Sequence, residues 1–565
     1  MHADLIRVAT AVALMLTFAV GGCGNSPSGT AAGGSVASAG KGGKKTNVLL
    51  ISVCSIRADH TSLYGYQRET TPNMTSFAQD AFVFDAAFAQ WPKTAPAFAS
   101  IVSGKYGHTT GVMRITPEQY LPPQHETLSE VLGAAGYETA AFLSSPALND
   151  TTNIAQGHKV YEELNKMRGV DARIAPTTRA LAFIKAQGDM PWFVWAHYNN
   201  AHYPYNGGGL NPETFVGDKF YDPSTKIKYY EKPGTALDVQ VDEGHIAYHQ
   251  ITRADLGGVH SNAIPRGRDK AMIRPDEYAY YIARYDAGIL GADQAVGRLL
   301  LGLREAGKFE DTLIVLVGDH GESLGEHNYY FEHGRFPYDN NSRVPFMVRP
   351  PGGVKSTRVS APVAVFSAGA TILDVLGMAR PKDWEARSAL PLARGEGGEP
   401  HVFTESGFQM DYQLAVRDAN WKLIHIPNPM DRTMLNGVEW ELYDWRSDTG
   451  EIRNVAQQNP DVVARLRGVL ENWSSPWVKE AYAKAPRSKK RVDAKTTGQL
   501  QTLGYVSETA EEEEDAKPAV APKRKPPALV VPLPAERGAA SPQLPRPAAP
   551  IAAPASQPSS KPSGG

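Results

Sequence analysis

The sequence predicts an α/β fold, in which helices cover a sheet of buried strands, and two observations predict it. Apolar runs without polar alternation, such as NVLLISV at 47–53 and TLIVLV at 312–317, are typical of strands buried on both faces. Segments with the helical spacing of apolar residues, such as 128–135 and 278–306, alternate with those runs. This alternation is typical of a strand layer with helices packed on it.

The first 22 residues predict a secretory signal peptide. Arg7 precedes an uncharged apolar run over 8–20, and Gly21-Gly22-Cys23 follows it. The run is shorter than the roughly 20 residues that a membrane span needs. Two small residues before a cysteine are typical of the lipobox of a bacterial lipoprotein, so we expect lipidation of Cys23; the alternative is a plain signal peptide with a chance cysteine.

We therefore expect the protein in a bacterial cell envelope, attached to the membrane by its lipid. Gly24, rather than an aspartate, follows Cys23 and favours the outer membrane, facing the periplasm or the cell surface. Residues 23–46 are rich in Gly, Ser and Ala and predict a flexible linker behind the anchor. No second long apolar stretch follows, so we expect no other membrane span.

The body between the linker and the tail carries the predicted elements. Besides 47–53 and 312–317, the segments 138–143 and 192–196 predict strands of the main sheet. Residues 207–274 are polar and rich in Gly and Pro, which predicts an insertion over the site that sets substrate choice.

The C-terminal part changes character. Short strand-like runs at 413–417, 421–426 and 440–443 precede a helical pattern at 461–473. They predict a small antiparallel domain. We place the domains at 47–395 and 396–507 and expect 508–565, acidic and then rich in Pro and Ala, to be a disordered tail.

Composition excludes several classes of protein. Two cysteines in 565 residues exclude a disulfide-dense scaffold and a four-cysteine zinc or iron–sulfur site. The formal charge of −2 provides no general attraction for nucleic acid, so we expect no such partner.

Polar residues follow two of the predicted strands. Cys54-Ser55 comes directly after the first strand, and Asp319-His320 follows the run TLIVLVG. In α/β sheets ligands gather beyond the carboxyl ends of the strands, so these residues are candidate site residues.

Several strings resemble sulfatases of the alkaline-phosphatase superfamily. VLLISVCSIRADHTSLYGYQRETTPNM resembles their opening, WPKTAPAFASIVSGKYGHTTGV their nucleophile segment and WAHYNNAHYPY their substrate-histidine loop. IVLVGDHGESLGEHNYYFEHGRFPYDNNSRVPF resembles their metal-and-sulfate loop with its return strand. LAVRDANWKLIHI, ELYDWRSDTGEIRNVA and LQTLGYV resemble their C-terminal subdomain and its last helix. The resemblance implies an alkaline-phosphatase-like fold, with a large mixed sheet flanked by helices and a smaller C-terminal antiparallel α+β subdomain.

The resemblance also implies a chemistry. In sulfatases, two acidic residues after the first strand and a later Asp-Asn or Asp-His pair hold a divalent cation, usually calcium, which orients a cysteine-derived formylglycine for attack on sulfur. Asp319 and His320 match the metal pair and His202 the substrate histidine, while His333 lies within one residue of a sulfate-contacting Lys or His. The alternative for Asp319-His320 is a solvated turn, and for His202 and His333 a structural histidine.

This sequence departs from the sulfatase pattern at four places. Cys54 and Ser55 stand where the first two acidic ligands are expected, and Thr94 stands at the nucleophile position, where no formylglycine can form. Phe98 replaces the supporting arginine, and 142–145 (FLSS) lacks the usual lysine. Calcium prefers oxygen ligands, so Cys54 is a doubtful ligand for it. The ligand set instead suggests zinc or manganese, or no metal.

Three hypotheses follow for this sulfatase-like protein. The first is an active metal-dependent phospho- or sulfo-hydrolase, or phosphoethanolamine-type transferase, with Thr94 as nucleophile. The second is a degenerate sulfatase that binds sulfated or phosphorylated anionic substrates, such as glycans, without turnover. The third is a surface-anchored interaction protein whose useful parts are the anchor and the Pro-rich tail.

Overall fold

The computed structural model describes residues 45–113, 120–167, 171–203, 205–206, 208–224, 278–408, 411–429, 432, 435, 437–479 and 495–498. The predicted signal peptide, the tail, the last-helix string LQTLGYV and Cys23 lie outside these residues, as does most of the predicted linker and insertion.

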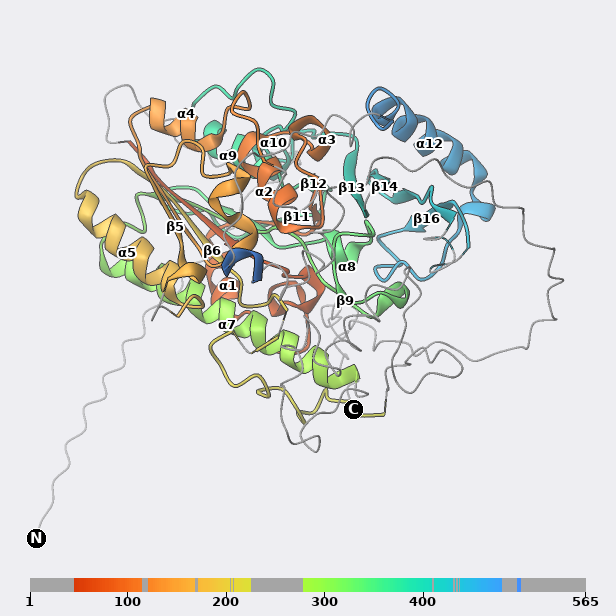
Figure 1. Cartoon of the computed structure of the whole chain (residues 1–565), viewed down its shortest axis with the longest axis horizontal. Coiled ribbons are helices and arrows are strands. Elements are labelled where there is room, and N and C mark those ends of the chain that lie inside the picture. Colours follow the sequence, from red (N-terminus) through yellow and green to blue (C-terminus); the bar gives the residue numbers. More distant parts are fainter. Residues whose placement is uncertain are drawn as a thin grey trace, which may run out of the picture. The chain divides into compact units, whose positions relative to one another are not determined.

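An eight-stranded mixed sheet forms the centre of the protein (Figure 1). Its strands, in spatial order, are β11 (Thr357–Val359), β2 (Phe82–Phe84), β10 (Phe346–Arg349), β7 (Thr312–Gly318), β1 (Asn47–Val53), β6 (Trp192–Tyr198), β4 (Glu138–Leu143) and β5 (Val160–Glu163). Strands β7, β1, β6, β4 and β5 run parallel, and β10 is antiparallel to both of its neighbours.

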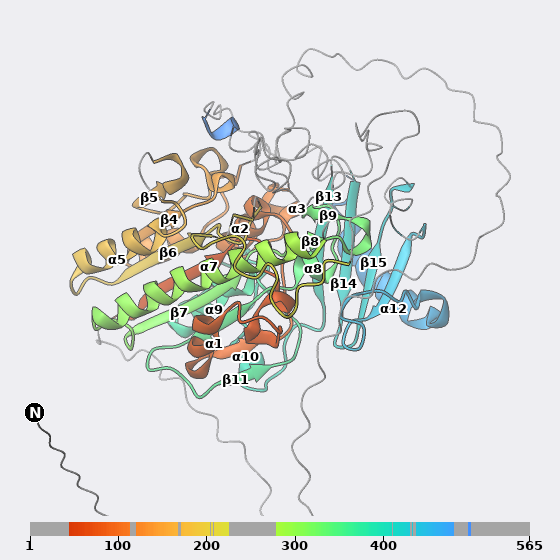
Figure 2. The same ribbon diagram turned by 90° about the horizontal axis from the view of Figure 1, so that it is seen from below.

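Helices cover both faces of this sheet. The helices of the described residues are α1 (Pro72–Phe77), α2 (Thr94–Ser103), α3 (Gly107–Thr110), α4 (Leu128–Ala134), α5 (Ala175–Gln187), α7 (Tyr278–Glu305), α8 (Asp339–Ser342), α9 (Ser367–Val375), α10 (Leu390–Ala393) and α12 (Pro460–Ser474). Apolar residues of α2, α4 and α9 share one core, and those of α1, α5 and α7 share another, so the two groups lie on opposite faces (Figures 1 and 2).

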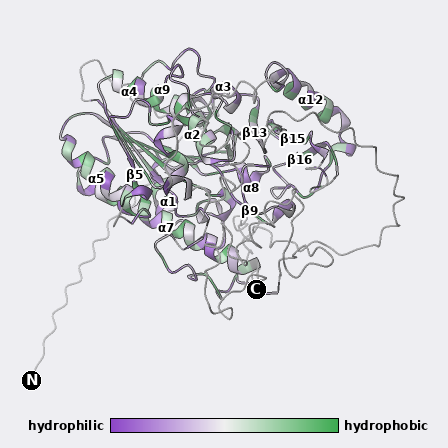
Figure 3. Cartoon of the chain, in the orientation of Figure 1, coloured by the Kyte–Doolittle hydropathy of each residue, from purple (hydrophilic) through white to green (hydrophobic). Residues whose placement is uncertain are grey.

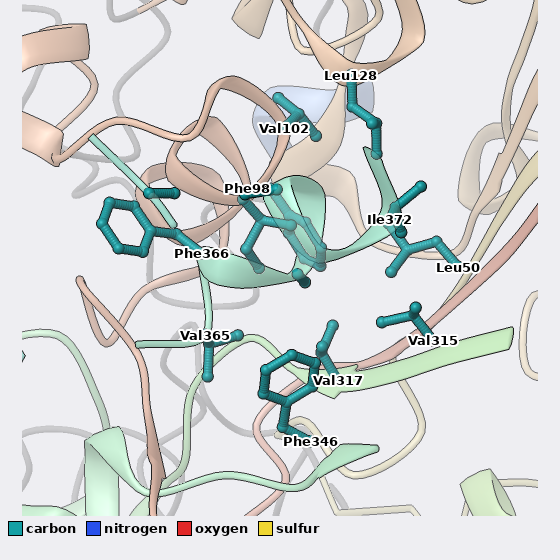
Figure 4. Packing of buried hydrophobic residues seen from close by; sticks show 14 of the residues in the cluster. Leu50, Phe98, Val102, Leu128, Val315, Val317, Phe346, Val365, Phe366 and Ile372 are labelled. Atoms are coloured by element: carbon teal, nitrogen blue, oxygen red, sulfur yellow. The ribbon is translucent and has the colours of Figure 1, made fainter. Parts of the chain in front are cut away.

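The central strands are buried on both faces. In β1, Leu50 packs in the core with α2 and α9, while Leu49 and Ile51 pack in the core with α5 and α7. Figure 4 shows the first of these cores, where Phe98 of α2 and Val317 of β7 point into the same packed layer. Two-sided burial explains why these strands are continuous apolar runs in the sequence.

A second, four-stranded antiparallel sheet follows in the chain. Its strands, in order, are β13 (Val402–Phe408), β14 (Asp411–Arg417), β15 (Trp421–His425) and β16 (Trp440–Asp444). Helix α12 packs on it through Leu466 and Leu470, which lie in a core with Leu414 and Leu423. Two-stranded pairs complete the described strands: β3 (Ala87–Phe88) with β12 (Val363–Ala364), and β8 (Ser323–Leu324) with β9 (Tyr330–Glu332).

The predicted fold class is confirmed. The large sheet is mixed, helices flank it, and a smaller antiparallel sheet lies toward the C-terminus. The four predicted strands of the main sheet and the long helix lie where the apolar patterns placed them, within two residues at each end. Strands β2, β5 and β11 of the main sheet were not predicted, and neither was β13 of the smaller sheet. The domain boundary at 395 stays a prediction.

Hydropathy follows the same plan. Helices α5, α7 and α12 each carry hydrophilic and hydrophobic stretches, as expected of helices with one buried side (Figure 3). Within the described residues, no helix is both long enough and apolar enough to cross a membrane.

Candidate active site

The candidate site lies at the carboxyl ends of β6, β1 and β7, three adjacent parallel strands of the large sheet. Cys54 directly follows β1, Asp319 directly follows β7, and His197 is the last residue but one of β6. The backbone N–H of Cys54 donates to the carbonyl of Tyr198 over 2.8 Å, which continues the β1–β6 pairing up to the site. Sheet pairing therefore places all three side chains at one edge.

Helix α2 delivers Thr94. Lys93 before it is extended (φ −154°, ψ 140°), and its carbonyl accepts the first helical hydrogen bond, from Ala97 N–H at 2.9 Å. Pro96 in the first turn lacks an N–H that would otherwise need a partner there. Thr94 is buried at the positive end of the ten-residue helix, a position that favours a bound anion.

Thr94 and His320 form a hydroxyl–imidazole pair. Oγ1 of Thr94 lies 3.0 Å from Nε2 of His320, and Nδ1 of His320 donates to the carbonyl of Gly321 over 2.8 Å. Because Nδ1 carries the proton, Nε2 has the lone pair that accepts the Thr94 hydroxyl. Sγ of Cys54 lies 3.4 Å from Oγ1 of Thr94. The pair of Thr94 and His320 therefore has the arrangement of a nucleophile with its base.

Two backbone amides orient the carboxylate of Asp319. Its Oδ1 accepts from the N–H of Ser55 at 3.1 Å and from its neighbour His320 at 2.8 Å, and its Oδ2 lies 3.5 Å from Nε2 of His320. Ser55 reaches Asp319 with a left-handed backbone (φ 55°), which is uncommon for a residue with a side chain and is found at functional sites. The hydroxyl of Tyr285 donates to the Ser55 carbonyl over 2.6 Å.

The two remaining predicted histidines join the same cluster. The ring of His333 stacks on that of His320, with centroids 4.2 Å apart, and the ring of His202 meets His333 edge to face at 5.1 Å. Nδ1 of His202 donates to the carbonyl of Tyr203 over 2.7 Å, and Nδ1 of His333 lies 3.2 Å from Oε1 of Glu322. The side chains of His202, His320, His333 and Glu322 are all buried.

Burial controls ionisation in this cluster. Loss of hydration raises the pKa of Asp319 to about 7 and that of Glu322 to about 8, and lowers the pKa of His197 to about 3. It also raises the pKa of the Cys54 thiol, with a further increase from nearby Asp319, and lowers the pKa of His320. Neutral forms are therefore favoured, and a neutral His320 is a proton acceptor.

Other residues near the predicted motifs have structural partners. Lys105 pairs with Asp383 and lies 2.9 Å from Nδ1 of His125, so it is engaged elsewhere. Arg57 bonds Asp59 at 2.7 Å and Glu326 at 2.7 Å, which ties the loop after β1 to the loop after β7.

The replacements for the sulfatase residues also have defined surroundings. The ring of Phe98 meets the His197 ring edge to face, with centroids 5.0 Å apart, and packs on Trp195 at 4.7 Å. Ser144 stands near the expected lysine, and its hydroxyl donates to the carbonyl of His197 over 2.9 Å. Apolar packing and a hydroxyl therefore replace two cations.

The structure brings six predicted residues together: Thr94, Cys54, Asp319, His320, His333 and His202. Two further members of the cluster, His197 and Glu322, were not predicted from the sequence. A signal for His197 was present, since it is a polar residue inside the apolar run WFVWAHY, which forms a strand buried along its whole length. Only Cys54, His197 and Asp319, among the described residues, form a group whose possible ligand atoms all lie within 4.8 Å of one another.

The sequence matches two protein-family models. Residues 46–378 match the sulfatase model, and residues 325–475 match the model of the C-terminal part of N-sulphoglucosamine sulphohydrolase. The chain is similar to N-acetylglucosamine-6-O-sulfatase of Bacteroides thetaiotaomicron, with 24% identity over 475 residues, which cover 73% of this chain and 83% of that protein.

Solved structures share the fold. The structure of BT4656 in complex with its substrate D-glucosamine-2-N,6-O-disulfate superposes with a TM-score of 0.56 at 21% identity, over 79% of this chain and 100% of that one. The phosphonate monoester hydrolase of Silicibacter pomeroyi has a TM-score of 0.56 at 20% identity, over 80% and 100% of the two chains. These similarities support the fold described above.

Proposed function

This chain belongs to the sulfatase family, and we propose that it hydrolyses sulfate or phosphate monoesters of carbohydrates with Thr94 as the nucleophile. One observation carries the proposal: the buried Thr94 hydroxyl lies 3.0 Å from Nε2 of His320, whose other nitrogen is held by the Gly321 carbonyl. A weak nucleophile with an oriented base in hydrogen-bond contact is the usual requirement for covalent catalysis.

The first step transfers the acid group to the enzyme. Oγ1 of Thr94 forms a bond to the sulfur or phosphorus of the ester while its proton moves to Nε2 of His320. The bond between that atom and the alcohol oxygen breaks, and the departing oxygen takes a proton from solvent. Because Nδ1 of His202 carries the proton that is donated to the Tyr203 carbonyl, Nε2 has the lone pair, and His202 is a proton acceptor.

The second step restores the enzyme. A water molecule attacks the sulfur or phosphorus of the threonine ester, and the bond to Oγ1 breaks. Oγ1 regains its proton from His320, and the proton that the water loses moves to Nε2 of His202 and from there to solvent. The N-terminus of α2 stabilises the negative oxygens of the transferred group in both steps.

The sulfatase family typically binds a divalent metal, and the residues present test which one fits. Calcium takes six to eight oxygen ligands, yet a thiol and a hydroxyl stand directly after β1, at Cys54 and Ser55. The site therefore does not fit calcium, and no step above passes through a metal. A different cation, zinc or manganese, suits the donor set better.

The substrate class rests on similarity and on charge. One relative is named for 6-O-sulfated N-acetylglucosamine, one solved relative holds a disulfated glucosamine and another is a phosphonate monoester hydrolase. Lys93 directly precedes Thr94, and its charge adds to the burial that lowers the pKa of His202 and His333, so a cation lies near the site. A positive charge and a helix N-terminus suit a sulfate or phosphate group.

A second candidate function is anionic-glycan binding without turnover. The observation that favours it is the replacement of acidic and cationic residues by Cys54, Ser55 and Phe98. Both functions predict that the purified protein binds sulfated or phosphorylated sugars, and only hydrolysis requires the Thr94 hydroxyl.

The test compares Thr94 variants on aryl sulfate and aryl phosphate esters, and then on glucosamine 6-sulfate and 6-phosphate. We expect Thr94→Ala to remove turnover and Thr94→Ser to keep part of it, because only serine retains the hydroxyl. Thr178→Ala, which changes an exposed threonine on α5, is the matched control and retains full activity. Equal rates in the unaltered protein and Thr94→Ala refute the nucleophile, and binding without turnover of any ester supports the second function.

We also propose that the protein is a lipoprotein of the bacterial cell envelope, attached through Cys23. The motif Gly21-Gly22-Cys23 after an apolar run supports this location.

A further inference from the structure

The three strand ends of the site carry one sulfur, one nitrogen and one oxygen donor. Cys54, His197 and Asp319 each offer one ligand atom, and the three atoms lie within 4.8 Å of one another. All three residues have no exposed surface. His197 lies in β6, and Cys54 and Asp319 directly follow β1 and β7, so the pairing of three adjacent strands sets where these residues meet.

A second observation, independent of the distances between the ligand atoms, concerns the imidazole of His197. Its Nδ1 lies 2.9 Å from Oγ of Ser52, while its Nε2 is buried and has no hydrogen-bond partner among the described residues. Buried polar atoms in native proteins are usually paired, so an unpaired nitrogen beside a thiol and a carboxyl needs a ligand.

The surroundings of His197 orient it as metal ligands are oriented. The Nε1–H of Trp195 donates to the same Ser52 oxygen over 2.8 Å, and the Phe98 ring packs on the imidazole. A proton on Nδ1 that is donated to Ser52 leaves the Nε2 lone pair for a cation.

Hydrogen bonds also fix the orientation of the Asp319 carboxylate. Its Oδ1 already accepts two backbone amides, so the carboxylate has a fixed plane and keeps Oδ2 for a further partner. A thiolate and a carboxylate together neutralise a dication, and the neutral imidazole adds no charge. The two acidic ligands expected after the first strand are missing, but the Cys54 thiolate and the Asp319 carboxylate still supply two negative charges for a dication.

We propose that Cys54, His197 and Asp319 bind one thiophilic divalent cation of the zinc type. The set of one sulfur, one nitrogen and one oxygen selects zinc over calcium and magnesium, which take oxygen. Zinc–sulfur and zinc–nitrogen bonds of about 2.3 and 2.0 Å bring ligands within roughly 4 Å of each other, so the cluster closes on an ion with shifts of under about 1 Å.

Three protein ligands leave one position of a tetrahedral ion open, as in catalytic zinc sites. Oγ1 of Thr94 is the neighbouring oxygen, 3.4 Å from Sγ of Cys54. The inference rests on the proposed function and deepens it, because an ion held there would lower the pKa of an adjacent hydroxyl and polarise the ester. His320 stays the base, since its Nε2 is used by Thr94.

Cobalt(II) is the probe, because a thiolate ligand gives it a strong charge-transfer absorption in the near ultraviolet. The full-length protein is stripped with chelator and titrated with cobalt(II), and zinc then displaces the cobalt. We expect one cobalt per chain, loss of the charge-transfer band in Cys54→Ser, and at least about tenfold weaker binding in His197→Gln.

Matched controls separate the outcomes. Cys23→Ser changes the other cysteine, and His158→Gln changes a half-buried histidine that is bonded to Ser129; both variants keep the band and the affinity. No band in the unaltered protein, a band that survives Cys54→Ser, or unchanged affinity in His197→Gln overturns the site. If Cys54→Ser does not fold, the band of the unaltered protein and the His197→Gln affinity still decide.

Thr94→Ala distinguishes this proposal from the proposed function. It removes no ligand, so it keeps the cobalt band while turnover is lost. Cobalt binding without turnover in the unaltered protein counts against hydrolysis alone, and turnover without any thiolate-bound metal counts against the metal site alone.

Discussion

A buried ion cluster ties the four-stranded sheet to the segment that follows His333, and removal of its lysine gives a sharp prediction. Lys422 of β15 places Nζ 2.8 Å from Oδ1 of Asp339 in α8 and 2.5 Å from Oε1 of Glu451. The side chains of Lys422, Asp339 and Glu451 are 1%, 5% and 1% exposed, and Arg417 pairs with Asp339 from the neighbouring strand. Lys422→Met keeps most of the buried chain and removes only the charge.

The magnitude follows from burial and from pKa. Removal of one partner of a buried ion pair costs about 3–5 kcal/mol, because the other charge stays buried without compensation. Burial, together with the nearby Asp339 charge, raises the pKa of Glu451 from its ordinary value to about 7. A carboxyl with a raised pKa favours the folded state at low pH, and this contribution is lost as the pH rises through 7.

The variant raises the pKa of Glu451 further, since the attraction of Lys422 is gone. Each unit by which the pKa of Glu451 rises destabilises the fold by about 1.4 kcal/mol at a pH above the raised pKa. At pH 5.5 the same rise changes the stability little, because Glu451 is protonated in both folded proteins. We therefore expect a loss of about 3 kcal/mol or more in unfolding free energy at pH 8.5 and a smaller loss at pH 5.5.

Urea unfolding followed by tryptophan fluorescence at the two pH values measures this difference. The matched control is Lys159→Met, because Lys159 pairs with Glu138 at 2.6 Å on the surface, with side chains 53% and 28% exposed. That pair contributes under about 1 kcal/mol at either pH. Equal losses in the two variants, or a larger loss for Lys422→Met at pH 5.5, refute the reasoning.

Two further predictions concern the site and the anchor. Cys54→Asp together with Ser55→Asp restores two carboxylates, and Asp tolerates the left-handed backbone at position 55 better than most residues. Calorimetric titration is expected to show at least about tenfold tighter calcium binding in this variant. Unchanged calcium affinity would mean that the site geometry cannot accept a set of oxygen ligands. Cys23→Ser is expected to release the protein from the membrane fraction and to remove the lipid mass from its N-terminal fragment; an unaltered lipid mass would contradict attachment at Cys23.

Strand β13 shows why part of the fold was not predictable from local pattern. Its sequence, VFTESGF, contains polar residues that read as a loop, yet Thr404 and Glu405 are buried. Oγ1 of Thr404 donates to the Ala89 carbonyl over 3.0 Å, and Glu405 bonds Nδ1 of His108. The partners lie about 300 residues earlier in the chain, so only the folded protein satisfies these groups.

The sequence by itself determined the fold class, the family resemblance and most of the candidate residues. Runs such as 47–53 predict buried strands because the information is local: a strand covered on both faces must be apolar along its length. Four site residues could be named because they stand at strand or helix ends within recognisable motifs. Asp319 and His320 match the sulfatase pattern, while Cys54 and Thr94 depart from it.

Tertiary structure alone decided which of those residues meet and what they can bind. The order β7–β1–β6 places Cys54 beside His197 and Asp319, residues more than 140 positions away in the sequence, and no periodicity encodes that order. The tautomer of His320 depends on the Gly321 carbonyl, and the unpaired Nε2 of His197 depends on packing around it. Contacts between distant segments therefore decided the chemistry of a site whose members the sequence had largely identified.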